Sequence, residues 1–176
     1  MTDLAPWHDI LLFAAATSLL FAAAQDVAVR TVPNRISLIV AAAGLGLNAL
    51  HGQLGAALFG GGLVFSGSWY CWRRGWIGGG DVKLLSACAL LVPPALVPAL
   101  VVSTAVAGGL LALVYVILGW ILKRRLPGGA AAPPTGLLRR VWRAERRRIC
   151  RRLSLPYACA ICAGVLLTLN LSVSPG

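Results

Sequence analysis

Charged side chains are scarce in this chain. Only 12% of its 176 residues are Asp, Glu, Lys or Arg, and only five of these are acidic. A soluble domain carries about 25% charged residues. Hydrophobic residues make up 59% of the chain, and the mean hydropathy is +0.82. The composition excludes an ordinary soluble domain and predicts an all-α integral membrane protein.

Cysteines are also few, and their pattern does not indicate disulfides. There are five, an odd number, and most lie inside apolar runs, where cysteine behaves as a small buried residue. Cys159 and Cys162 form a lone Cys-x-x-Cys pair inside an apolar segment, whereas tetrahedral zinc needs four ligands. We therefore expect no metal ion and no other cofactor.

Six apolar segments are each predicted to form a membrane-spanning helix within one domain covering residues 1–176. Their approximate bounds are 10–24, 36–50, 54–72, 82–97, 99–122 and 155–171. The stretch 82–122 is counted as two spans because, as one helix at about 1.5 Å per residue, it would be roughly 60 Å long. That is about twice the 30 Å hydrocarbon core. Pro93, Pro94 and Pro98 mark the position of the break.

The distribution of Lys and Arg predicts the orientation. All 16 lie in or beside the first, third and fifth loops, and eleven of them lie in the basic loop 123–152. Because basic residues collect on the cytoplasmic side, we expect these three loops in the cytoplasm and both termini outside it. The net charge of +11 has this origin, so it does not indicate a nucleic-acid partner. Residues 139–152 are predicted to form a basic amphipathic helix that lies on anionic membrane lipid.

Two of the five acidic residues, Asp26 and Asp81, lie at ends of apolar segments on the predicted cytoplasmic face. Two neighbouring carboxylates do not both ionise readily, so one keeps a proton near neutral pH while the other is charged. The charged one can take a proton from an attacking water, and the protonated one can hydrogen-bond a peptide carbonyl oxygen. The pair is therefore a candidate for acid–base peptide hydrolysis.

Each aspartate also has a purely structural interpretation. Asp26 and Arg30 are four residues apart and would form an ion pair on a continued helix. Asp81 is a suitable N-cap for a helix that begins at Val82.

Three glycines, Gly78, Gly79 and Gly80, directly precede Asp81. A helix cap does not require them, whereas a run without side chains lets a substrate backbone lie close to the acid. A phosphate-binding loop would need a following Lys-Ser/Thr and an α/β context, and neither is present. We therefore predict that the three glycines bind substrate. Lys83 has three possible roles: it binds a substrate carboxylate, it reduces the free-energy cost of placing negative charge on the acid pair, or it extends to the membrane interface.

Three short motifs follow one another along nearly the whole chain. The first is Asp26 with Arg30 and Val32-Pro33-Asn34; the second is Gly78-x-Gly80-Asp81 followed by Val82-Lys83-Leu84-Leu85; the third is Leu155-Pro156-Tyr157-Ala158. In this order they resemble motifs of the type IV prepilin peptidases: an aspartate ahead of Ile/Val-Pro-Asn, then Gly-x-Gly-Asp, then Leu/Ile-Pro-Tyr-Gly.

The resemblance implies a multi-pass aspartic endopeptidase of the bacterial inner membrane. Such an enzyme removes the N-terminal leader of prepilins at the cytoplasmic face, and the motif match makes Asp26 and Asp81 its catalytic pair. Long members of that family also N-methylate the new terminus and carry a cytoplasmic insert with paired Cys-x-x-Cys motifs. This chain has no such insert, so we expect no methylation, and its short form is similar to the peptidases of Flp/Tad pili.

Other functions remain open at this stage. A preflagellin or pseudopilin peptidase would use the same chemistry on another substrate. A small proton- or cation-coupled transporter could use the two aspartates, although it would carry them near mid-span. A structural membrane subunit would leave the glycines and the acids without a reason. The sequence does not indicate an oligomeric state.

The predicted orientation can be tested in the basic loop. A single cysteine at Thr135, in a variant without other cysteines, should not react with an impermeant maleimide in intact cells, because loop 123–152 is expected in the cytoplasm. The same cysteine should react after the membrane is permeabilised. Labelling in intact cells would reverse the orientation.

Overall fold

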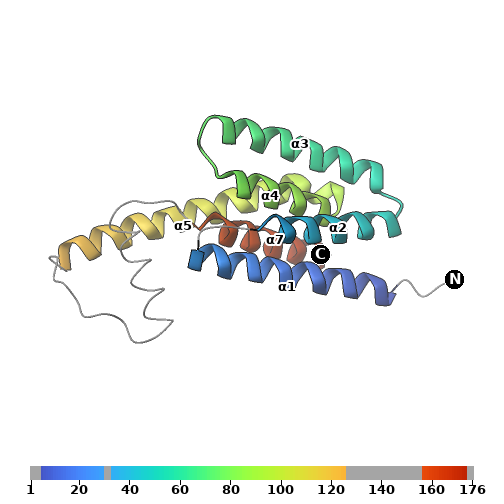
Figure 1. The fold of residues 1–176 in the computed structure, drawn as a ribbon, viewed down its shortest axis with the longest axis horizontal. Helices are drawn as coiled ribbons and strands as arrows, with labels where there is room; N and C mark the ends of the chain where they lie inside the picture. Colours follow the sequence, from blue (N-terminus) through green and yellow to red (C-terminus); the bar gives the residue numbers. More distant parts are fainter. Residues whose placement is uncertain (1–4, 30–32, 126–155, 174–176) are drawn as a thin grey trace.

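The computed structural model describes residues 5–29, 33–125 and 156–173, and these residues form a bundle of helices without any strand (Figure 1). The α-helices are α1 (Ala5–Val29), α2 (Asn34–Leu50), α3 (Leu54–Arg73), α4 (Gly79–Leu91), α5 (Val97–Arg125) and α7 (Tyr157–Val173). A 3₁₀ turn, η1 (Pro94–Leu96), joins α4 to α5. The predicted all-α fold class is therefore confirmed.

Helix α4 lies at the centre of the packing. It contacts α2, α3 and α7, while α1 packs on α2 and α7, and α5 packs on α7. Six of the 13 residues of α4 are buried, including Leu84 and Cys88, which are fully enclosed. Helix α3 rests mainly on α4 at one edge of the bundle (Figure 1). The first turns of α2, α4 and α7 and the last turn of α1 lie at the same end of the bundle (Figure 1).

Prolines end α4 earlier than we predicted from the sequence. The fourth segment was expected to reach residue 97, but α4 stops at Leu91, and Val92 is extended with ψ 153°. Pro93 causes this, because the residue before a proline is disfavoured in the helical region. Pro98 lies in the first turn of α5, where the missing N–H costs no helical hydrogen bond.

A side chain of α2 compensates for this proline break. In a continued helix the carbonyl of Leu90 would accept a hydrogen bond from the N–H of residue 94, but Pro94 has none. Instead the Asn48 amide Nδ2 donates to Leu90 O at 2.9 Å and to Gly44 O at 3.0 Å. The α4 terminus is thus held to α2 although it lies inside an apolar bundle, where an unpaired carbonyl is costly.

Small residues allow the close approach of α2 and α3 to α4. A Cβ added at Gly44 would overlap the backbone of Leu90 and the backbone nitrogen of Leu91. A Cβ added at Gly61 would lie 2.6 Å from the Leu90 side chain. Glycines at such positions let helix backbones pack closely in lipid, where helices gain little from the hydrophobic effect.

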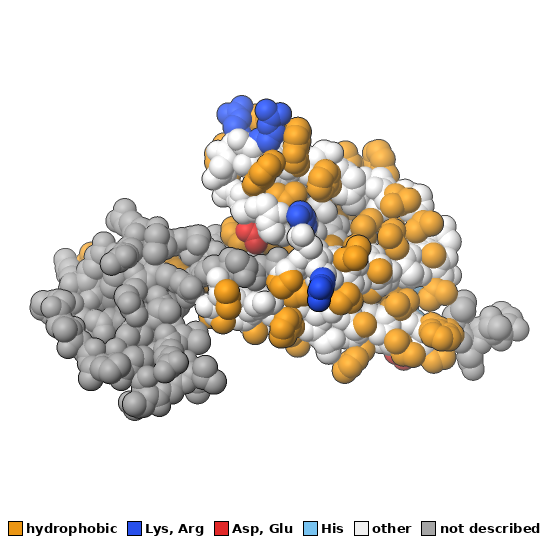
Figure 2. Space-filling model, in the orientation of Figure 1, with side chains coloured by type: hydrophobic (Ala, Val, Ile, Leu, Met, Phe, Trp, Pro, Cys, Tyr) orange, Lys and Arg blue, Asp and Glu red, His pale blue; other side chains and the backbone are white. Residues whose placement is uncertain are grey.

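Large apolar side chains cover much of the surface. Figure 2 shows them scattered across the visible face of the described bundle, together with only a few Lys and Arg side chains. Phe13 on α1, Phe59 on α3 and Val116 on α5 are all strongly exposed. Within the described residues, two helices are long and apolar enough to cross a membrane, Pro6–Val29 and Pro94–Ile121, and Asn34–Leu50 and Tyr157–Asn170 are shorter apolar helices. These features agree with a bundle that is surrounded by lipid.

Several expectations stay predictions. The six-span arrangement and the outside position of the termini are not tested by the helices alone. The expected basic helix at 139–152, and most of the basic loop that contains it, lies outside the described residues.

The tight contact at Gly44 gives a prediction on stability. Gly44→Ala should lower the free energy of unfolding by about 1–3 kcal/mol, because the new methyl group overlaps fixed backbone of α4. Gly62→Ala is the matched control, since a Cβ there meets no atom within 4 Å. Thermal unfolding in detergent should show a lower midpoint for the first variant only. Equal midpoints would contradict the packing of α2 on α4.

Candidate active site

Asp26 lies in the last turn of α1 and is buried, with 6% of its surface exposed. Its Oδ2 accepts a hydrogen bond from the backbone N–H of Ala158 at 3.0 Å. A second contact between the same helices is made by the Cys159 thiol, whose Sγ lies 3.6 Å from Ala23 O. Two residues that are 132 positions apart in sequence are therefore joined at one end of the bundle.

The Ala158 N–H is available to Asp26 because it lies at the start of α7. Pro156 precedes the helix, and the helix begins at Tyr157, so the N–H of Ala158 belongs to the first turn and has no carbonyl of its own helix to bind. Asp26 satisfies that N–H, and the positive end of the α7 dipole favours a negative charge beside it. Tyr157 packs on α5, where a Cβ added at Gly108 would lie 3.0 Å from its hydroxyl oxygen.

Asp81 lies in the first turn of α4, but it is not the N-cap. The helix begins at Gly79, and Gly78 is the N-cap residue with extended backbone (ψ 147°). The interpretation of Asp81 as the cap of a helix starting at Val82 is therefore wrong by three residues. Asp81 is the third residue of the helix, and its carboxylate turns back to Gly78, where a Cβ would lie 2.8 Å from Oδ2. This close approach gives a physical reason for glycine at position 78.

The other glycines of the run have different surroundings. A Cβ added at Gly79 would lie 3.3 Å from the indole Nε1 of Trp72, so Gly79 lets α3 and α4 converge at this end. Gly80 is exposed. Gly75, in the loop between the two helices, has a φ of +75°, which a residue with a side chain rarely adopts. The predicted contact of the glycines with substrate is not tested by these observations.

The negative charge of Asp26 acts on the carboxyl of Asp81. Asp81 is half-buried and precedes the apolar segment that begins at Val82. The pKa of its carboxyl is raised from 3.8 to about 6, first by burial and second by the negative charge of Asp26, while a hydrogen bond with the Gly78 backbone acts in the opposite direction. Because a Coulomb interaction weakens with distance, the contribution of Asp26 means that the two carboxylates lie near each other.

Lys83 does not join the two acids. Its Nζ donates a hydrogen bond to Asn34 Oδ1 at 3.0 Å, at the first residue of α2. Residues two apart on a helix do not face each other, so Lys83 and Asp81 leave α4 on different sides. The alternative ion pair of Asp26 involves Arg30, which lies outside the described residues.

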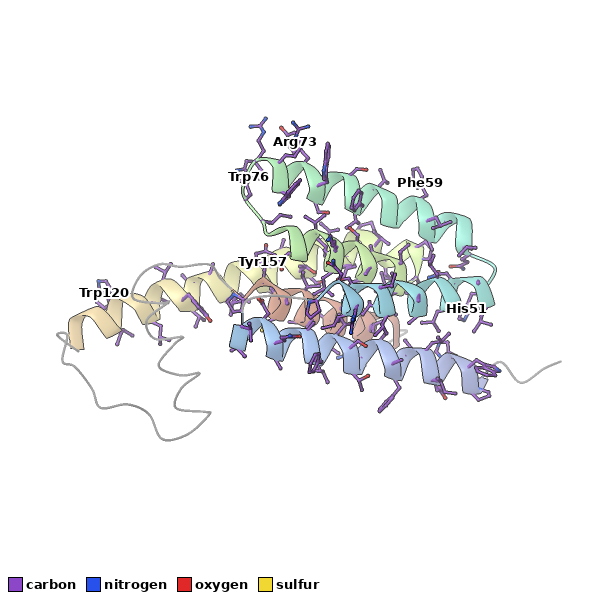
Figure 3. The ribbon with its side chains drawn as sticks, in the orientation of Figure 1. His51, Phe59, Arg73, Trp76, Trp120 and Tyr157 are labelled. Atoms are coloured by element: carbon purple, nitrogen blue, oxygen red, sulfur yellow. The ribbon has the colours of Figure 1, made fainter. Side chains whose placement is uncertain are left out.

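The two histidines are placed away from the acids. His8 and His51 contact each other edge to face, with ring centroids 5.7 Å apart. Figure 3 shows His51 at the end of the bundle opposite to Tyr157 and Trp76. The four cysteines in the described ranges, which include Cys159 and Cys162, form no disulfide with one another. The same ranges contain no group of three or more His, Cys, Asp or Glu that could hold a metal ion.

Some contacts at this site were not foreseen from the sequence. The Ala158 N–H and the Asn34 side chain both belong to motifs that the sequence analysis identified, but neither had been given a role. No sequence pattern indicated a role for Trp72, because its contact with Gly79 depends on how α3 and α4 converge.

A comparison with known protein families matches residues 13–113 to the type IV leader peptidase family. This range covers more than half of the chain and includes both Asp26 and Asp81, but it ends before α7. Neither the comparison with curated proteins nor that with solved structures gave a match. On the strength of the family match, together with the paired acids at one end of an apolar helical bundle, the chain belongs to the type IV leader peptidase family.

Proposed function

We propose that the chain is an aspartic endopeptidase in which Asp26 and Asp81 cut the leader from a prepilin of the Flp type. The observation that carries the proposal is that α1 ends and α4 begins at the same end of the bundle (Figure 1), where the charge of Asp26 acts on the carboxyl of Asp81. Membership of a leader peptidase family supports peptide hydrolysis as the reaction. The scissile peptide would enter at the cytoplasmic face of the inner membrane, where the loops rich in Lys and Arg are expected.

The surroundings of the two acids suggest different roles for them. Asp26 accepts an N–H from the first turn of α7, and both that hydrogen bond and the helix dipole stabilise its ionised form. Asp81, with its raised pKa, holds a proton more readily. We therefore assign Asp26 as the general base and Asp81 as the general acid of the first step.

The proton transfers then balance as follows. Asp26 takes a proton from water while the water oxygen attacks the scissile carbonyl carbon, and Asp81 gives its proton to the carbonyl oxygen. As the tetrahedral intermediate collapses, Asp26 passes its proton to the leaving amine nitrogen, and Asp81 recovers a proton from the hydroxyl that becomes the new carbonyl. The two carboxyls end as they began, so no cofactor is required.

The glycines suit the position of the substrate backbone. Gly78 and Gly79 are tightly placed against Asp81 and Trp72, whereas Gly80 is exposed beside the acid. An extended leader segment could therefore approach the backbone at Gly80, which has no side chain of its own. A transporter that relays protons is less well supported, because both acids lie in terminal turns of their helices rather than at mid-helix.

The first prediction from this proposal concerns the acids themselves. Asp26→Asn and Asp81→Asn should each reduce leader removal by about a thousandfold or more, since asparagine keeps the size and the acceptor oxygen but transfers no proton. The double variant should be scarcely worse than either single variant, because the two groups act as one unit. Co-expression with a Flp-type prepilin, followed by mass measurement of the product, gives the readout.

Asp9→Asn is the matched control for these variants. Asp9 is exposed and lies near the opposite end of α1 from Asp26, so its loss should leave cleavage unchanged. Asparagine at position 81 can still accept the hydrogen bond from the Gly78 backbone, so a role restricted to the helix terminus predicts an active variant. Near wild-type cleavage by either asparagine variant would overturn the proposal.

The second prediction concerns pH. If Asp81 is the acid, kcat/KM should be full below about pH 6 as long as Asp26 is ionised, and it should fall as the pH rises through that value, because the deprotonated Asp81 carboxyl has no proton to give. The decline should approach about tenfold for each pH unit. A purified enzyme in detergent and a fluorogenic leader peptide allow the measurement between pH 5 and 8. A kcat/KM that increases over this range would contradict the assignment of Asp81 as the acid.

A further inference from the structure

One hydrogen bond links the second catalytic motif to the first across the bundle. Lys83 lies two residues after Asp81, and its Nζ donates to Oδ1 of Asn34 at 3.0 Å. Asn34 lies eight residues after Asp26 and opens α2. The two partners are 49 residues apart in sequence, so the bond depends on how α2 and α4 are placed against each other.

The direction of the Lys83 side chain separates it from the acids. It leaves α4 on a different side from Asp81, toward the start of α2. A lysine that only extended to the membrane interface would need no fixed acceptor. The side chain of Asn34 does not cap α2 either, since the N-cap of that helix is Pro33 and no side chain caps it. The Lys83 and Asn34 side chains therefore act in the contact between α4 and α2.

The contact between α2 and α4 has few polar features that could fix its register. Apolar side chains such as Val40 and Leu84 pack in its core. Asn48 holds the carbonyl of Leu90 near the far end of both helices, and Lys83 holds Asn34 near the end that carries the acids. A slide or rotation of α4 against α2 would break this second bond, and it would also move Asp81 relative to Asp26.

We propose that the Lys83–Asn34 hydrogen bond is a positioning contact that sets the distance between Asp81 and Asp26. Neither residue touches the reacting atoms in this proposal. They act through α4 and α2, and the inference rests on the proposed function of the two aspartates. Because misplacement of a catalytic group by about 1 Å can reduce the rate by about a hundredfold, one such bond can control kcat.

A double-mutant cycle tests the proposal. Lys83→Met keeps an unbranched side chain one atom shorter and removes the donor, and Asn34→Leu keeps the size but removes the acceptor. Each single variant should lower kcat for leader removal by about ten- to a hundredfold, with KM nearly unchanged. The double variant should be no slower than the slower single variant, because both changes remove the same bond. Lys83→Arg keeps a donor and should restore a large part of kcat.

Arg35→Gln is the control for the loss of positive charge. Arg35 is exposed and follows Asn34 in α2, so its change removes one cation at the same end of the bundle and leaves the bond intact. It should leave kcat near the wild-type value. If Lys83→Met does not insert into the membrane, Asn34→Leu carries the test alone, because it removes the bond without changing the charge.

Three results would overturn the inference. The first is a wild-type kcat for Asn34→Leu. The second is additive losses in the cycle. The third is a rise in KM for Lys83→Met alone, which would indicate a substrate carboxylate as its partner. The outcome is separate from that of the proposed function, which fails only if an asparagine variant of Asp26 or Asp81 remains active.

Discussion

A carboxylate buried in an apolar bundle needs hydrogen-bond donors, and this need governs the arrangement around Asp26. An uncompensated buried charge costs several kcal/mol in folding free energy. Asp26 lies in the last turn of α1, where the negative end of its own helix dipole disfavours a second negative charge. The compensation comes from α7, whose first turn offers the N–H of Ala158 at 3.0 Å. The bundle therefore has to bring the start of its last helix against the end of its first one.

The second acid, Asp81, lies in the first turn of a short helix, α4. With 13 residues this helix is about 20 Å long, less than the roughly 30 Å of a hydrocarbon core. It can be short because Pro93 and Pro94 end it and because Asn48 takes up the carbonyl that Pro94 leaves without a donor. Irregular backbone at this depth is tolerated where protein surrounds it. The proline break and Asp81 therefore lie at opposite ends of α4, the central helix, which packs against α2, α3 and α7.

Much of this could be predicted from the sequence, and the rest could not for physical reasons. Hydropathy predicted helices, the paired prolines predicted the break after the fourth segment, and the scarcity of acids drew attention to Asp26 and Asp81. The N-terminus of α4 was misplaced because three glycines are poor helix formers in isolation, so a helix that includes two of them is favoured only by its packing. The bonds Lys83–Asn34 and Ala158–Asp26 join residues 49 and 132 positions apart, and such pairs follow from the fold rather than from any local pattern.

The role of α7 extends the site beyond the part of the chain that carries the family match. That match ends at residue 113, before the last helix begins at Tyr157. Yet the donor to Asp26 is a backbone group of α7, and a backbone donor places no demand on the identity of its own side chain. It does require that the helix begin at Tyr157, one residue before the donor, and Pro156 favours that start. What Asp26 requires of this helix is therefore the position of its first turn.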